Sequence, residues 1–183
     1  PSFPSMPNIE DFSTLGTEDL IQALSISLYE PPLNRLHETL SSQPEVVRVL
    51  TLVLDFDTEV SMNGILGFLE NSTGQWLGET IEAFDLIEAN GTASVLRRIY
   101  EAMNRHGITS SALRAEVNTA TPYTVMSFSE LHGAKSEDIS REVTQIAREL
   151  YVGNPAASED PWSLLCEYVT LRRQYLLDAL RVT

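Results

Sequence analysis

Hydrophobic residues recur at helical spacing from residue 17 onward. Leu20, Leu24 and Leu28 repeat every fourth residue, Thr17 precedes them as a suitable N-cap, and Pro31 follows them. Because a helix lays residues four apart on one face, this pattern predicts a helix over residues 17–30. A second, short helix is expected over residues 32–39.

Residues 44–60, PEVVRVLTLVLDFDTEV, carry a broad apolar face. Pro44 suits a first helical turn, and the apolar residues after it suit a central helix surrounded by others. The many β-branched side chains make a buried strand the alternative, but the length of the segment and the flanking proline favour a helix. The Asn63-Gly64 pair then breaks the pattern before a shorter helix that ends at Gly74.

The second half of the chain continues with helical patterns. Helices are predicted over residues 75–90, 92–106, 110–118, 136–152 and 161–182, with a loop or brief extended segment at residues 119–127. The first of these helices is expected to stop at Asn90-Gly91, and two others are expected to end before Gly107 and Gly153.

No internal repeat is present in the chain. These patterns predict an all-α fold, a compact single-domain helical bundle of about eight to ten helices that is not a solenoid. The domain is expected to span residues 17–183. Residues 1–16, which contain Pro1, Pro4 and Pro7, are expected to form an extended N-terminal arm.

Charge is distributed unevenly along the chain. The net charge is −14, from 12 basic and 26 acidic residues, and residues 1–90 hold 15 of the acids but only two arginines. Between Arg48 and Arg97, 48 consecutive residues contain no Lys or Arg. Because such a surface repels phosphates and attracts basic proteins, direct nucleic-acid binding is not expected, and a basic protein partner is.

Cysteine content and hydropathy bear on the compartment. Cys166 is the only cysteine, so an intrachain disulfide is excluded and a reducing environment is expected. The first residues do not resemble a secretory signal, and the longest nearly apolar run is broken by Arg48 and too short to span a bilayer. The expected location is the cytoplasm, away from membranes.

Asp55, Asp57 and Glu59 resemble the start of a calcium-binding loop. Such a loop needs Gly at its sixth position and Glu at its twelfth, where this chain has Val60 and Leu66. On a helix, Asp57 also points away from the other two carboxylates. No metal site is therefore predicted. The glycines between residues 64 and 78 lack the Gly-Lys-Ser/Thr sequence of a phosphate-binding loop, so no phosphate site is predicted either.

Glu79, Glu82, Asp85 and Glu88 recur every third residue in the helix predicted over residues 75–90. Each step advances about 4.5 Å along the axis, so the four carboxylates form a row about 13 Å long. None of them has a Lys or Arg four residues later, although soluble helices usually mix the two signs. Duplex DNA also presents regularly spaced negative groups. The alternative interpretation is an acidic face that only interacts with solvent.

Residues 59–74, EVSMNGILGFLENSTG, resemble the core signature of a bacterial domain-of-unknown-function family of small acidic proteins that includes the DNA-mimic proteins. That signature reads approximately Glu-Val-x-Asn-Gly-Gly-Phe-x-Gln-Phe-Phe-x-Asn-Ser-x-Gly. The matching positions are Glu59, Val60, Gly64, Phe68, Asn71, Ser72 and Gly74. The positions that depart from it are Met62, Asn63, Ile65 and Gly67.

The resemblance implies a mainly α-helical, often dimeric protein without catalytic residues or a cofactor. It implies that carboxylates take the place of DNA phosphates on the DNA-binding surface of a partner such as a helix-turn-helix regulator. The signature itself is assigned to the fold, with Glu59 accepting backbone N–H groups of the Asn-Gly turn. The structural motif residues are Glu59, Gly64, Asn71, Ser72 and Gly74.

Taken together, these observations predict a non-enzymatic acidic protein that binds a basic protein partner, and the resemblance implies that it can form a homodimer. The expected partner-binding residues are Asp55, Asp57, Glu70, Glu79, Glu82, Asp85 and Glu88. One alternative is an immunity-type or antitoxin-type interaction module, for which an excess of acidic residues would also be suitable. Another is an enzyme whose site brings together distant residues such as His106, Tyr123 and His132. If Arg97, Arg98, Arg105 and Arg114 pair with acids of the first half, the exposed negative surface is smaller than the sequence implies.

Overall fold

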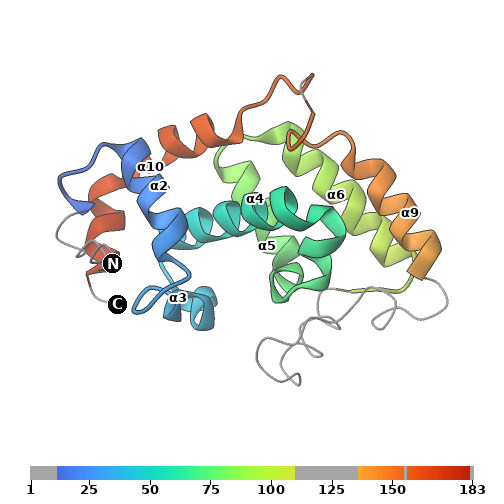
Figure 1. The fold of residues 1–183 in the computed structure, drawn as a ribbon, viewed down its shortest axis with the longest axis horizontal. Helices are drawn as coiled ribbons and strands as arrows, with labels where there is room; N and C mark the ends of the chain where they lie inside the picture. Colours follow the sequence, from blue (N-terminus) through green and yellow to red (C-terminus); the bar gives the residue numbers. More distant parts are fainter. Residues whose placement is uncertain (1–11, 110–135, 155, 182–183) are drawn as a thin grey trace, which may run out of the picture. The chain divides into compact units, whose positions relative to one another are not determined.

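All regular structure in the described residues, which are 12–109, 136–154 and 156–181 of the computed structural model, is helical (Figure 1). The predicted all-α class is confirmed. These residues hold seven α-helices and two 3-10 helices, so the expectation of eight to ten helices is slightly too high for them. The predicted helix at residues 110–118, the loop at residues 119–127 and most of the N-terminal arm lie outside the described residues.

The chain divides into two compact units. The first unit consists of Pro1–Thr51 and Trp162–Thr183, and the second consists of Leu52–Pro161. The boundary at residue 51 lies inside a long helix, α4 (Glu45–Glu70). That residues 17–183 form a single domain stays a prediction.

The first unit contains α2 (Thr17–Ser27), α3 (Arg35–Glu38), the 3-10 helix η1 (Leu40–Ser42), the start of α4, and almost all of α10 (Pro161–Leu180). The predicted leucine stripe of α2 is buried. Arg173 of α10 donates hydrogen bonds to the backbone carbonyls of Phe12 and Ser13 at 3.3 Å and of Leu15 at 2.6 Å. These bonds hold the segment before α2 against α10.

The segment that was ambiguous between helix and strand is helical, as part of α4. Every residue from position 49 to position 56 is buried, as expected for a central helix. Gly64 interrupts α4 with φ 70° and ψ −179°, a backbone conformation that favours glycine. The predicted break at Asn63-Gly64 is therefore confirmed.

The second unit contains the rest of α4, the 3-10 helix η2 (Ser72–Trp76), α5 (Leu77–Leu86), α6 (Asn90–Arg105) and α9 (Ser136–Ala147). In its core, the ring of Phe56 meets the rings of Phe68 and Phe84 edge to face, with centroids 5.0 Å and 5.1 Å away. These contacts fix α5 against α4. α6 packs against both α5 and α9 (Figure 1). α9 ends at Ala147, earlier than the predicted stop at Gly153.

Candidate acidic interface

Glu79, Glu82 and Asp85 lie on α5, where the sequence placed them, but Glu88 does not. α5 ends at Leu86, so the expected row of four carboxylates along one helix is wrong in its last member. Glu82 and Glu88 are exposed, and Glu79 and Asp85 are half-buried. We call Glu82, Asp85 and Glu88 the acidic corner, because they lie at the end of α5 and in the turn that follows.

Glu88 occupies a turn position that usually belongs to glycine. Its φ is 64°, the N–H of Ala89 donates to the carbonyl of Phe84 at 2.9 Å, and its own N–H donates to the carbonyl of Asp85 at 3.0 Å. This pair of bonds is the Schellman motif that closes a helix C-terminus. The predicted stop at Asn90-Gly91 is therefore wrong, since Asn90 already begins α6.

The three members of the acidic corner differ in their contacts. Among the described residues, neither Glu82 nor Glu88 forms an ion pair. The Oδ2 atom of Asp85 accepts a hydrogen bond from the Nη2 atom of Arg97 on α6. The expectation that second-half arginines pair with first-half acids thus holds for Arg97, and the charge displayed at the corner is reduced by that pair.

Asp55 is not part of this surface. It is only 4% exposed, because it belongs to the stretch of α4 that is buried on every side. The assignment of Asp55 to an exposed, partner-binding surface is therefore wrong. Asp57 is half-buried, and its Oδ1 atom accepts a hydrogen bond from the Tyr151 hydroxyl at 2.7 Å. Burial, followed by the nearby Asp57 carboxylate, raises the pKa of Tyr151, so the phenol stays protonated as the donor.

Hydrogen bonds to Glu59 connect residues on the two sides of the break in α4. The Oε2 atom of Glu59 accepts hydrogen bonds from the side-chain amides of Asn63 at 3.2 Å and Asn71 at 2.5 Å. Glu59 therefore binds side-chain amides rather than the expected backbone N–H groups. At Gly74, a Cβ atom would lie 2.6 Å from the carbonyl oxygen of Leu69, so the close approach of the chain excludes a side chain there. Ser72, the first residue of η2, is exposed.

The remaining partner-binding candidate, Glu70, is half-buried at the end of α4. Glu70 and Glu79 both make contacts within the protein. The fully displayed carboxylates of the predicted surface are therefore Glu82 and Glu88.

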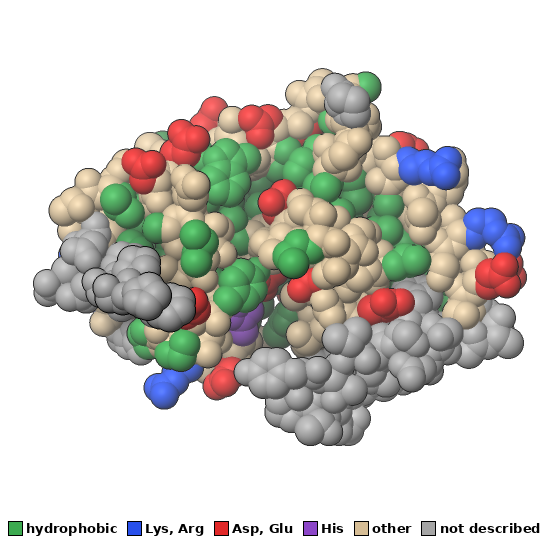
Figure 2. Space-filling model, in the orientation of Figure 1, with side chains coloured by type: hydrophobic (Ala, Val, Ile, Leu, Met, Phe, Trp, Pro, Cys, Tyr) green, Lys and Arg blue, Asp and Glu red, His purple; other side chains and the backbone are tan. Residues whose placement is uncertain are grey.

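A second group of acids lies on α9 and the connection after it, residues 136–154 and 156–160, which we call the strap. Glu149 accepts two hydrogen bonds from the guanidinium of Arg98, at 2.6 Å and 2.9 Å. Glu142 accepts from Arg105 and lies 3.0 Å from the Nε2 atom of His106. Figure 2 shows acidic and basic side chains side by side over α9.

These pairs change the titration of both strap acids. Hydrogen bonds from His106 and then Arg105 lower the pKa of Glu142. The hydrogen bond from Arg98 lowers the pKa of Glu149. Arg98 and Arg105 therefore pair with second-half acids, which differs from the expectation, and Arg114 lies outside the described residues.

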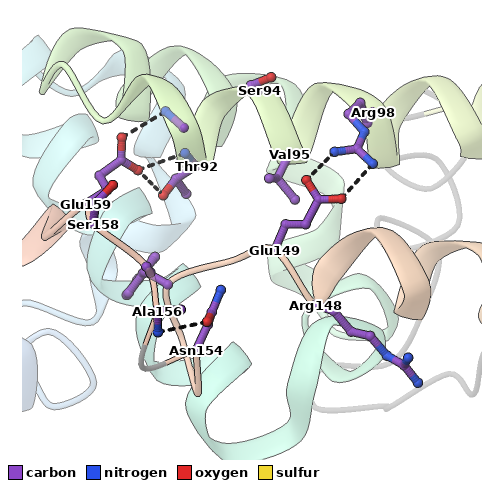
Figure 3. Close-up of a pocket in the computed structure, with 13 residues that line it drawn as sticks. Thr92, Ser94, Val95, Arg98, Arg148, Glu149, Asn154, Ala156, Ser158 and Glu159 are labelled. Carbon is purple, nitrogen blue, oxygen red and sulfur yellow. Dashed lines mark hydrogen bonds and ion pairs between the residues drawn. The ribbon is translucent and has the colours of Figure 1, made fainter.

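A third strap acid, Glu159, caps α6. Its Oε1 atom accepts from the backbone N–H of Gly91 at 2.8 Å, and its Oε2 atom accepts from the N–H and the hydroxyl of Thr92 at 2.8 Å and 2.5 Å. Figure 3 shows this carboxylate pointing at the first turn of α6. A carboxylate is favoured there, because the first N–H groups of a helix lack partners within it. Sequence reasoning missed Glu159, since 67 residues separate it from Thr92.

Next to this cap lies a hollow of about 450 Å³ between α6 and the strap. Its lining includes Arg98, Glu149 and Glu159, which already bind one another or the start of α6 (Figure 3). The protein's own carboxylate thus fills the anion-binding position at this helix N-terminus. The side chain of Arg148 points away from the Arg98–Glu149 pair (Figure 3).

The described residues contain neither a candidate metal-ion site nor a candidate membrane-spanning helix. Within residues 12–109, 136–154 and 156–181, no group of three or more His, Cys, Asp or Glu side chains is placed to hold a metal ion. No helix in that part of the chain is long and apolar enough to cross a membrane. Of the residues considered for an enzyme site, His106 binds Glu142, while Tyr123 and His132 lie outside the described residues.

Comparison with known proteins adds one finding. A family model described as DMP19-like protein matches residues 41–154, which include α4, α5, α6, α9 and the acidic corner. No curated protein matches the chain, and no solved structure matches it.

Proposed function

Because the chain belongs to the DMP19-like protein family, we propose that it is a non-enzymatic DNA mimic that binds a basic DNA-binding protein. The matched residues make up more than half of the chain and contain all of α5 and the turn after it. The family's name refers to DNA mimicry, which agrees with the acidic character of the sequence.

One observation carries this proposal above the others. Glu82 and Glu88 are exposed and form no ion pair within the described residues, although α6 beside them carries arginines. Arginines of α6 do bind Glu149 and Glu142, but they leave the two exposed corner carboxylates unpaired. The unpaired carboxylates are therefore free to bind basic groups of another protein.

The chemistry of the corner suits a protein that normally binds DNA. Duplex DNA presents one negative charge about every 3.4 Å per strand, and the two corner acids on α5, Glu82 and Asp85, are about 4.5 Å apart along the helix axis. A basic DNA-binding surface, such as that of a helix-turn-helix regulator, would meet charges at a similar spacing. The binding is expected to weaken with salt, because it depends on exposed charges.

A DNA-displacement assay tests the proposal. Purified helix-turn-helix domains are bound to fluorescent operator DNA, and the protein is added while the anisotropy is followed. We expect displacement by the native protein, and about tenfold weaker displacement by a variant in which Gln replaces Glu82 and Glu88, because two exposed ion pairs with the partner are lost.

The matched control removes the same number of acids from the first unit. Its substitutions are Glu30→Gln and Glu38→Gln, both at exposed positions. If this control loses as much activity as the first variant, net charge rather than the acidic corner is responsible. Failure of the native protein to displace any DNA would refute the mimicry.

A further inference from the structure

We propose that Arg97 competes with the partner for the acidic corner. In the free protein its guanidinium binds Asp85, and in the complex an arginine of the partner replaces it. This inference rests on the proposed function, and it concerns how the same surface is regulated. Its chemical basis is that the protein already shows a guanidinium bound at one of the carboxylates expected to bind a basic partner.

The Arg97–Asp85 pair has the properties of an exchangeable contact. It joins α6 to the last turn of α5, and the two side chains are 49% and 37% exposed. Ion pairs with this exposure contribute little to stability, because water solvates both groups well when they separate. A partner guanidinium can therefore replace that of Arg97 at small cost.

The Arg97–Asp85 pair reduces the number of free carboxylates at the corner. Asp85 lies between Glu82 and Glu88 in the chain, and those two carboxylates have no base beside them in the described structure. Arg97 neutralises the middle member of the three. Without Arg97, the corner would offer three free carboxylates in place of two.

Arg98 provides a matched comparison within the same helix. It is the next residue along α6 and is similarly exposed at 46%, but both of its terminal nitrogens bind Glu149 of the strap. Substituting either arginine by Gln changes the net charge by the same amount. Only Arg97→Gln adds a free carboxylate beside Glu82 and Glu88. Arg98→Gln releases Glu149 of the strap, where Glu142 and Glu159 are already bound to α6, so the released carboxylate stands alone.

The test measures the affinity of a fluorescent nine-residue oligoarginine peptide at low ionic strength. We expect Arg97→Gln to bind it roughly twofold to fivefold more tightly than the native protein, the range typical of exposed ion pairs. Arg98→Gln should stay within about 1.5-fold of the native value. The double variant Arg97→Gln/Asp85→Asn should return to the native value, because the released carboxylate is then absent. Arg97→Ala also lacks the guanidinium and should show the same gain as Arg97→Gln.

Three results would overturn the inference: no gain in either Arg97 variant, an equal gain in Arg98→Gln, or a gain that persists when Asp85 is also replaced. Circular dichroism melting identifies any variant that does not fold, and the Arg97→Ala protein then decides. The DNA-displacement assay judges the proposed function separately. Tighter oligoarginine binding by Arg97→Gln without DNA displacement by the native protein would support Arg97's role and contradict mimicry.

Discussion

Carboxylates of the acidic corner and of the strap both lie beside α6, yet they are used differently. On the strap, Glu142, Glu149 and Glu159 each accept hydrogen bonds from α6 or the residue after it. At the corner, Glu82 and Glu88 accept none from a base in the described structure, and only Asp85 is paired. The strap acids hold two segments together, while Glu82 and Glu88 of the corner are exposed to solvent.

This difference shows why net charge is a poor guide to the surface. Each acid counts the same in the net charge of −14, whether it lies on the strap or at the corner. Arg98 and Arg105 offset the charges of Glu149 and Glu142, so these two strap acids contribute less to the external field. Glu82 and Glu88 are exposed and pair with no base in the described residues, so no such neutralisation is present at these two positions.

The largest expected effect is a loss of stability when a strap acid, Glu159, is replaced. Glu159→Ala removes the acceptor of two backbone N–H groups and one hydroxyl at the start of α6. Loss of a charged cap typically costs about 2 kcal/mol, so the free energy of unfolding should fall by about that amount. Urea denaturation measures it.

Glu82→Ala is the matched corner substitution for that experiment. Because Glu82 is exposed and forms no ion pair in the described ranges, its replacement should change the free energy of unfolding by less than about 0.5 kcal/mol. Equal destabilisation by both substitutions would contradict the distinction between strap and corner.

A smaller effect of opposite sign is expected at Glu88. Glycine adopts a positive φ without the steric strain of a side chain, so Glu88→Gly should stabilise the protein by about 1 kcal/mol. The same substitution removes a corner carboxylate and should weaken DNA displacement. The two measurements are urea denaturation and the displacement assay.

Glu88→Gln separates the backbone effect from the charge. Gln has a Cβ atom like Glu, so this variant should show the weaker displacement without the gain in stability. If Glu88→Gly weakens displacement and Glu88→Gln does not, the turn conformation rather than the carboxylate is responsible.

Local sequence patterns were sufficient for most helices. The leucine stripe before Pro31 and the apolar run after Pro44 predicted α2 and the start of α4, and the Asn63-Gly64 pair predicted the break within α4. Each of these signals depends on neighbours in the chain, which a single sequence displays directly.

The errors have local and long-range causes. The end of α5 was placed at Asn90-Gly91 because glycine normally closes a helix, whereas Glu88 takes that position here. Asp55 is predicted at the surface because it is charged, yet it is only 4% exposed. Its burial depends on the packing of the whole helix, which residue spacing does not reveal. The pairing of Arg98 with Glu149, 51 residues away, likewise has no signal in residue spacing.

The smallest expected effect is a difference in acid sensitivity between strap and corner. Arg and His partners depress the pKa of Glu142 below its ordinary value of 4.5, so the folded state gains from its ionised form. That contribution is complete above about pH 4.5 and is lost as the pH falls through the depressed pKa. Because the pair is exposed, we expect it to account for at most about 2 °C of the melting temperature.

Glu142→Gln tests this effect. Its melting temperature should be lower than that of the native protein at pH 6, and the gap should close below pH 4, where Glu142 of the native protein becomes protonated. Glu82→Gln has no pair to lose, so its melting curve should run parallel to that of the native protein over the same range. A gap for Glu142→Gln that stays constant down to pH 3 would mean that packing, rather than the charge of Glu142, holds the strap on α6.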